Sequence, residues 1–195
     1  MHGPPVSVRG IAIDLNGHAG SKDESPSARL LIHYRTRSQS PSLSSFQYRS
    51  PPVVSISIMR RFSFCAGHRL VGHEGKCQNL HGHNYIIEVY VTGQKQDAVG
   101  RILDFKQLKN RCKGWIDDNW DHSFVLWQED QNGLDAIRSS EPHRIYELDS
   151  NPTAENMAKH FLEVVCPQIL ADTGASAYKV ILWESEETYA EVTLD

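Results

Sequence analysis

The chain changes in composition near Met59, and this change divides its 195 residues into two parts. Residues 1–58 are rich in Ser, Pro and Gly and carry six basic and three acidic residues, a net charge of +3. Residues 59–195 carry fourteen basic and twenty-one acidic residues, a net charge of −7. Because the first part has too little periodic apolar sequence to offset the entropy of ordering, we expect residues 1–58 to be a disordered extension. Its broken hydrophobicity and its acids disfavour a signal or transit peptide, and we hypothesise that Met59 is the genuine start.

Charge and composition exclude several classes of protein. The net charge of −4 argues against a protein that coats nucleic acid or acidic lipid. No run approaches the eighteen apolar residues that would indicate a membrane span. Four scattered cysteines do not have the density of a disulfide framework, so a reducing, cytoplasmic setting is expected.

Apolar periodicity runs from Ser55 to the C-terminus and predicts four strands and two helices. The strands are expected around residues 56–64 and at Tyr85–Thr92, Tyr178–Trp183 and Thr188–Leu194. Asp104, in a capping-box pattern, is expected to start a helix that runs to about Ile116. Thr153 is expected to cap a second helix, which Pro167 ends or bends. The order β-β-α-α-β-β predicts an α+β fold, an antiparallel sheet with both helices on one face.

Three of the ten histidines have the spacing of metal ligands. His81 and His83 flank Gly82, so their side chains lie on one face if the segment is extended. His68 follows the first strand, and a hairpin-like return would bring it beside them. Three imidazoles suit zinc and leave its fourth position open, which is typical of a catalytic site. The alternative is that these are ordinary surface histidines, which commonly occur at this spacing.

Cys77 is the best candidate for acid–base or nucleophilic chemistry. It lies four residues before His81, and a dication or a protonated imidazole nearby favours the reactive thiolate. Cys65 and Cys166 are expected to belong to the apolar core. Cys112 lies in the first predicted helix and has no obvious partner.

Two further sites carry carboxylates. Asp121 precedes His122, and a carboxylate beside an imidazole can fix its tautomer, although this pair is also an ordinary loop dipeptide. Glu184 ends the strand that includes Trp183, where an acid is costly without a partner. A carboxylate there can accept paired hydrogen bonds from a guanidine-like edge, such as that of a pterin or a guanine.

These residues together resemble the 6-pyruvoyltetrahydropterin synthase and 6-carboxytetrahydropterin synthase family. The matching motifs occur in family order across residues 59–195, the expected catalytic domain. They are Phe62–Leu70 (FSFCAGHRL), Cys77–Tyr85 (CQNLHGHNY), Leu103–Phe105, Asp121–His122, Asn151–Asn156 (NPTAEN) and Trp183–Glu184.

The resemblance implies a tunnelling fold whose subunits assemble into trimers and hexamers, an oligomeric barrel with active sites at subunit interfaces. It also implies one zinc ion per subunit on three ligands, His68, His81 and His83. Cys77 would abstract protons, Asp121 and His122 would be its relay partners, and Glu184 would anchor the pterin. Thr153 and Glu155 correspond to family positions near the site, although capping explains both.

The spacing from Cys77 to His81 resembles the queuosine-pathway branch of the family. That branch converts 7,8-dihydroneopterin triphosphate to 6-carboxytetrahydropterin, acetaldehyde and triphosphate. Two alternatives stay open. One is elimination of triphosphate to give 6-pyruvoyltetrahydropterin, and the other is a non-catalytic pterin- or purine-binding module. The stretch from Trp127 to Asp149 is longer than in compact members, and its role is open.

Overall fold

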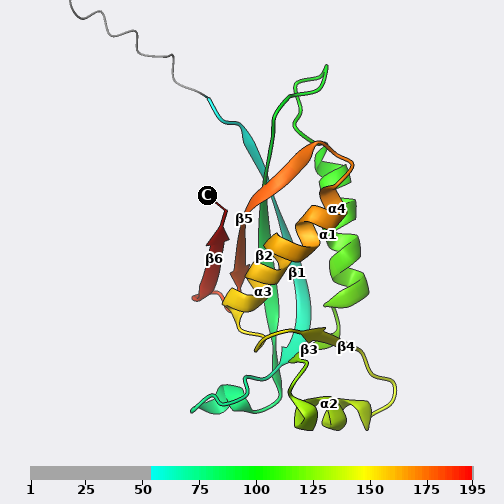
Figure 1. Ribbon diagram of the computed structural model, residues 1–195, viewed down its shortest axis with the longest axis vertical. Helices are drawn as coiled ribbons and strands as arrows, with labels where there is room; N and C mark the ends of the chain where they lie inside the picture. The colour runs from blue at the N-terminus through cyan, green and yellow to red at the C-terminus, as the bar shows by residue number, and fades with distance from the viewer. Residues whose placement is uncertain (1–53, 195) are drawn as a thin grey trace, which may run out of the picture. The chain divides into compact units, whose positions relative to one another are not determined.

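Two long antiparallel strands form the centre of the computed structural model, which describes residues 54–194 (Figure 1). Strand β1 (Ser57–His68) pairs with β2 (His81–Gly93) along its whole length. In β1 the side chains of Phe62, Phe64 and Ala66 are buried, whereas those between them are exposed. This alternation is the period of two that the sequence predicts. β2 begins four residues earlier than expected, so the His-Gly-His segment lies inside a strand.

The sheet is mixed rather than antiparallel, and it has six strands. Its order is β4-β3-β1-β2-β5-β6, in which β5 and β6 add antiparallel pairs at one edge. At the other edge β3 pairs with β1 in parallel and β4 pairs with β3 in parallel. The additional strands are β3 (Ser123–Trp127), β4 (Ile145–Leu148), β5 (Ala175–Trp183) and β6 (Tyr189–Thr193). The expected β5 and β6 are confirmed, whereas β3 and β4 are absent from the sequence-based prediction.

The helices that pack against the centre of the sheet lie on one face, as expected (Figure 1). They are α1 (Phe105–Asn119) and a continuous helical path of α3 (Ala154–His160), the π-helix η2 (Phe161–Val165) and α4 (Cys166–Leu170). Leu108, Cys112 and Ile116 of α1 are fully buried in the same core as Met157 and Phe161. This packing sandwiches the apolar side chains of the strands between sheet and helices.

Both predicted helix caps are confirmed. The Asp104 carboxylate accepts hydrogen bonds from the N–H groups of Lys106 and Gln107, and the Thr153 hydroxyl accepts one from the N–H of Asn156. Pro167 does not end the second helical path, which continues to Leu170. Since proline has no N–H to donate, the path widens into η2 just before it.

The stretch from Trp127 to Asp149 folds into a short helix, α2 (Gln131–Arg138), between β3 and β4. Asp130 caps α2 by accepting a hydrogen bond from the N–H of Gly133, and its buried carboxylate forms an ion pair with Arg69. Arg69 directly follows His68 at the end of β1. The Arg69 guanidinium holds the pKa of the Asp130 carboxyl below its usual range. The ion pair therefore ties α2 to the strand that carries the first histidine.

Gly133 is required by this ion pair. A Cβ at Gly133 would overlap the Asp130 carboxylate and would lie 3.0 Å from Arg69 Nε. We expect Gly133→Ala to destabilise the protein by about 1–3 kcal/mol, because the pair must shift to admit the methyl group. Gly114→Ala in α1, where a Cβ would meet nothing within 4 Å, should instead stabilise it by about 0.5–1 kcal/mol. Denaturant unfolding measures the change in the free energy of unfolding of each variant. An unchanged stability in Gly133→Ala would contradict the requirement for glycine beside the ion pair.

Within residues 54–194, no helix is long and apolar enough to cross a membrane. The predicted extension at residues 1–58 and the hypothesis of a start at Met59 fall mostly outside the described residues. β1 begins at Ser57, two residues before Met59.

Candidate metal centre and pterin site

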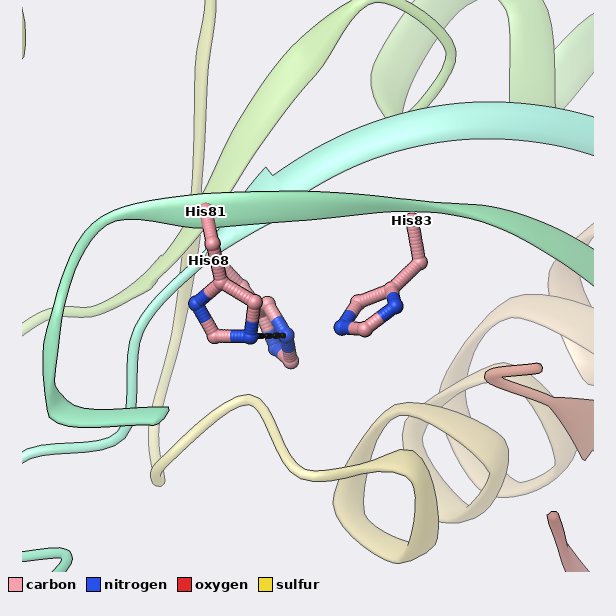
Figure 2. Close-up of side chains that lie close together, drawn as sticks. All are labelled: His68, His81 and His83. Atoms are coloured by element: carbon pink, nitrogen blue, oxygen red, sulfur yellow. Dashed lines mark hydrogen bonds between the residues drawn. The ribbon is translucent and has the colours of Figure 1, made fainter. Parts of the chain in front are cut away.

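The pairing of β1 with β2 brings the three predicted histidines together (Figure 2). His68 is the direct partner of His81, and Ala66 is the partner of His83, so all three imidazoles lie on the helix-covered face of the sheet. Their candidate ligand nitrogens lie within 4.8 Å of one another. The Nε2 atoms of His68 and His81 are 3.2 Å apart. The predicted hairpin-like return of the chain is therefore confirmed.

Backbone carbonyls fix the tautomers of two rings. His68 Nδ1 lies 2.8 Å from the carbonyl oxygen of Pro152, and His81 Nδ1 lies 2.7 Å from that of Asn79. Since a carbonyl only accepts, both Nδ1 atoms carry a proton, and in its neutral form each ring presents an Nε2 lone pair. The two Nε2 atoms are 3.2 Å apart, a separation at which both can bind one cation, and the Tyr85 hydroxyl also lies 3.2 Å from His68 Nε2. Outer carbonyls of this kind are typical partners of metal-binding histidines.

His83 completes the set of donors. Its Nε2 is buried and has no hydrogen-bond partner among residues 54–194, and the nearest oxygen of Glu184 is 3.9 Å away. Burial lowers the pKa of both His83 and His68. At His68 the hydrogen bond with the Pro152 carbonyl raises the pKa and offsets part of this effect. The lower pKa favours the neutral form of both rings, which is the form that binds a metal. The three residues fit a divalent ion such as zinc.

Gly82 is explained by strand packing rather than by room for a metal. A Cβ at Gly82 would lie 2.8 Å from the carbonyl oxygen of Ala66, closer than a real Cβ contact. That Cβ would point away from the histidines, since neighbouring residues in a strand face opposite sides. The glycine therefore allows β1 to approach β2 closely where the histidines are paired.

Cys77 and Glu184 line one hollow of about 300 Å³ beside the histidines. Cys77 lies on the 3₁₀-helix η1 (Lys76–Gln78), and Glu184 directly follows β5. Thr153 and Glu155 at the start of α3 also line the hollow. The Glu184 carboxylate is 3.6 Å from His68 Nε2 and remains partly exposed. A thiol and a carboxylate thus share one hollow, and the carboxylate borders the histidine cluster.

Asp121 and His122 lie elsewhere on the chain. The Asp121 carboxylate accepts a hydrogen bond from the N–H of Cys65, and its Oδ1 is 3.1 Å from His122 Nδ1. Burial alone would raise the pKa of Asp121, but the Cys65 N–H, His122 and Lys113 together lower it. The His122 side chain is 76% exposed. It lines a second hollow, of about 470 Å³.

This second hollow belongs largely to the opposite side of the sheet. It is lined by Cys65 and Asn84, which are direct partners in the register and alternate with the buried Phe64 and Tyr85. Cys65 is therefore exposed, and the expectation that it belongs to the core is wrong. Its Sγ lies 3.0 Å from the side-chain oxygen of Asn84. Within one chain, the structure does not bring Asp121 and His122 into the hollow that holds Cys77.

The sequence does not predict the pair of hydrogen bonds that holds the loop carrying Cys77. The Asn151 amide accepts a hydrogen bond from the N–H of Val71 at 2.8 Å and donates one to its carbonyl at 2.9 Å. The next residue, Pro152, supplies the carbonyl to His68. The Asn-Pro dipeptide thus joins the loop after β1 to a histidine of the cluster. In the sequence, the dipeptide indicates a turn by its composition and opens the Asn151–Asn156 motif, but neither signal predicts these hydrogen bonds.

A family model described as 6-pyruvoyl tetrahydropterin synthase matches residues 57–195. The chain belongs to this family. A 6-carboxy-5,6,7,8-tetrahydropterin synthase from Rickettsia typhi is 39% identical over 137 residues, which are 70% of this chain and 99% of that protein. The protein of the same name from Haemophilus influenzae is 30% identical over 139 residues, 69% of this chain and 96% of that protein. The resemblance seen in the sequence is confirmed.

Solved structures share the fold of this chain. An uncharacterized protein from Wolinella succinogenes superposes with a TM-score of 0.64 at 21% identity, covering 73% of this chain and all of that one. A Plasmodium vivax 6-pyruvoyltetrahydropterin synthase variant gives 0.56 at 19% identity, covering 73% of this chain and 99% of that one. At these identities the likeness concerns the fold alone, an α+β arrangement around a six-stranded sheet.

Proposed function

We propose that this chain is a zinc-dependent lyase that converts 7,8-dihydroneopterin triphosphate and water to 6-carboxytetrahydropterin, acetaldehyde and triphosphate, in queuosine biosynthesis. The observation that carries the proposal is the shared hollow of Cys77 and Glu184 beside a cluster of three imidazoles. The names of the relatives in Rickettsia typhi and Haemophilus influenzae support this branch of the family. The Cys-x3-His-Gly-His spacing supports it independently.

His68, His81 and His83 are the proposed ligands of one zinc ion per subunit. When bound, zinc supplies Lewis-acid polarisation of the oxygens on the substrate side chain. The carbonyls of Pro152 and Asn79 orient two of these rings and hold their tautomers.

Cys77 is the proposed proton-abstracting residue, and Glu184 is the proposed pterin anchor. A carboxylate can accept two parallel hydrogen bonds from the amino-pyrimidine edge of a pterin, and Glu184 keeps enough exposure to do so. With the pterin held there, its side chain would extend toward the histidines and the Cys77 thiol. A purely pterin-binding module would need the carboxylate but neither the thiol nor the imidazoles.

The remaining proton relay, Asp121 and His122, is proposed to come from a neighbouring copy of the chain. His122 lines the second hollow, which His81 and His83 also line, and its exposed ring is free to reach a second subunit. Self-association into trimers or hexamers would place this pair against the Cys77 hollow of another subunit. In each subunit the catalytic domain is proposed to be residues 59–195, in a cytoplasmic protein whose four described cysteines are all free thiols.

Incubation with dihydroneopterin triphosphate tests the proposal. We expect the zinc-loaded full chain to consume the substrate, and the chelator-treated chain to recover this activity when zinc is restored. Recovery of unchanged substrate by mass spectrometry, from a protein that nevertheless binds it, would instead identify a binding module.

A further inference from the structure

We propose that Arg144 is a positioning residue that holds the Asp121–His122 turn in the conformation that presents the His122 imidazole. Arg144 directly precedes β4, in the stretch whose role the sequence leaves open. The consequence for catalysis rests on the proposed function of His122, whereas the effect on the conformation of the turn does not.

The Asp121–His122 turn has a backbone conformation that needs support. His122 has φ of 56°, the only positive φ among the non-glycine residues described. Residues other than glycine adopt this left-handed region at an energetic cost, so contacts around the turn must stabilise the conformation. On one side, the Cys65 backbone does so, since its N–H donates to the Asp121 carboxylate and its carbonyl accepts from the His122 N–H at 2.7 Å.

Arg144 holds the turn from the other side. Its guanidinium donates to the carbonyl of Asp121 at 3.1 Å, and to those of Asp117 and Asp118 at 2.9 and 2.7 Å. The last two carbonyls lie in the final turn of α1, where backbone acceptors lack partners within the helix. One planar group therefore joins the helix end to the turn that follows it.

The sequence of α1 makes this cation necessary. Its last turn contains no basic residue but carries the carboxylates of Asp117 and Asp118, which the negative end of the helix dipole disfavours. Lys113 pairs with Asp117 and reaches the Asp121 carboxylate at 3.9 Å, but it makes no bond to these carbonyls. Among residues 54–194, the guanidinium of Arg144 is the cation that donates hydrogen bonds to these carbonyls.

The backbone of Arg144 is itself anchored beside the turn. Its carbonyl accepts a hydrogen bond from the N–H of Phe124 at 2.9 Å, two residues after His122. The parallel pairing of β3 with β4 starts at that point. The segment from β3 to β4 thus contacts two parts of the proposed site. Asp130 pairs with Arg69, next to His68, and Arg144 bonds the turn that carries His122.

Arg144→Gln tests the proposal, with Arg144→Lys as a second variant that keeps the charge but not the planar three-way contact. We expect kcat to fall about 10- to 100-fold in Arg144→Gln, with KM within about twofold and zinc content unchanged. Millimolar guanidinium should restore part of the lost kcat. Arg138→Gln is the control: it removes an exposed ion pair with Glu147 in the same unit and should keep wild-type kcat.

Histidine NMR provides the measurement that does not require turnover. In protein with 13C-labelled histidine rings, the His122 resonances, assigned with His122→Gln, should shift in both Arg144 variants and stay in place in Arg138→Gln. Unshifted His122 resonances in Arg144→Gln would overturn the proposal. A wild-type kcat together with shifted resonances would support the positioning of the turn and would overturn the proposed role of His122 in turnover. If the wild-type chain shows no turnover, the proposed function fails, and the resonances alone still decide whether Arg144 positions the turn.

Discussion

Replacing Cys77 with alanine is expected to lower the turnover of dihydroneopterin triphosphate by about 10²- to 10⁴-fold, the range for loss of a general acid–base group. The thiol lines the hollow beside the histidines but is not among the three residues whose nitrogens form the metal cluster. Zinc content should therefore stay at the wild-type value. Steady-state kinetics and elemental analysis on the same preparation measure both quantities.

Cys112→Ala is the matched control for the loss of a thiol. Cys112 is fully buried in α1, and burial raises the pKa of its thiol to about 12, so it is unreactive at neutral pH. We expect this variant to lose some stability but to keep its turnover within about twofold, since no proposed step uses it. Wild-type turnover in Cys77→Ala would remove the thiol from the reaction.

Replacing His81 with alanine is expected to weaken zinc binding by at least about 100-fold, more than the usual cost of losing an outer partner of a ligand. The other two imidazoles remain, but two ligands no longer define a tetrahedral site. Turnover should be lost with the metal. Competition with a coloured chelator measures the affinity, and elemental analysis after dialysis measures the content.

His143→Ala provides the comparison, because His143 lies in the loop before β4 and its ring faces Ser140 and Glu141 instead of the cluster. It should bind zinc as the wild-type protein does. Unchanged zinc affinity in His81→Ala would contradict the assignment of the ligands, whatever the variant's activity.

Four of the six strands and both helix caps could be predicted because their signals are local. Asp104 and Thr153 cap helices through their own side chains, and β1 follows an alternation visible in the sequence. β3 and β4 could not be predicted in the same way. They are five and four residues long, and their parallel partners are distant in the chain, so their pairing depends on tertiary contacts.

The side chains of the site were predictable, but their supports were not. Histidines at i and i+2 share a face of any strand, so the cluster required only that β1 return along β2. The carbonyls of Pro152 and Asn79 carry no signal in the sequence, because every residue has one. The wrong placement of Cys65 has a simpler cause: its neighbour Phe64 is buried, and adjacent residues in a strand face opposite sides.

The separation of Asp121 and His122 from Cys77 depends on the sheet. The turn that carries the pair is held by the backbone of Cys65 at one edge of β1, whereas Cys77 lies beyond the end of that strand. Motif order along the chain does not reveal which side of the sheet each motif reaches. The proposal that a second copy supplies the relay therefore arises only once the strands are placed.

The ratio of acetaldehyde to triphosphate released by the zinc-loaded chain tests the central claim most directly. The proposed reaction cleaves the substrate side chain once for each triphosphate lost, so a molar ratio of about one is expected, with 6-carboxytetrahydropterin as the pterin product. Triphosphate release without acetaldehyde, with 6-pyruvoyltetrahydropterin as the pterin product, would contradict the account.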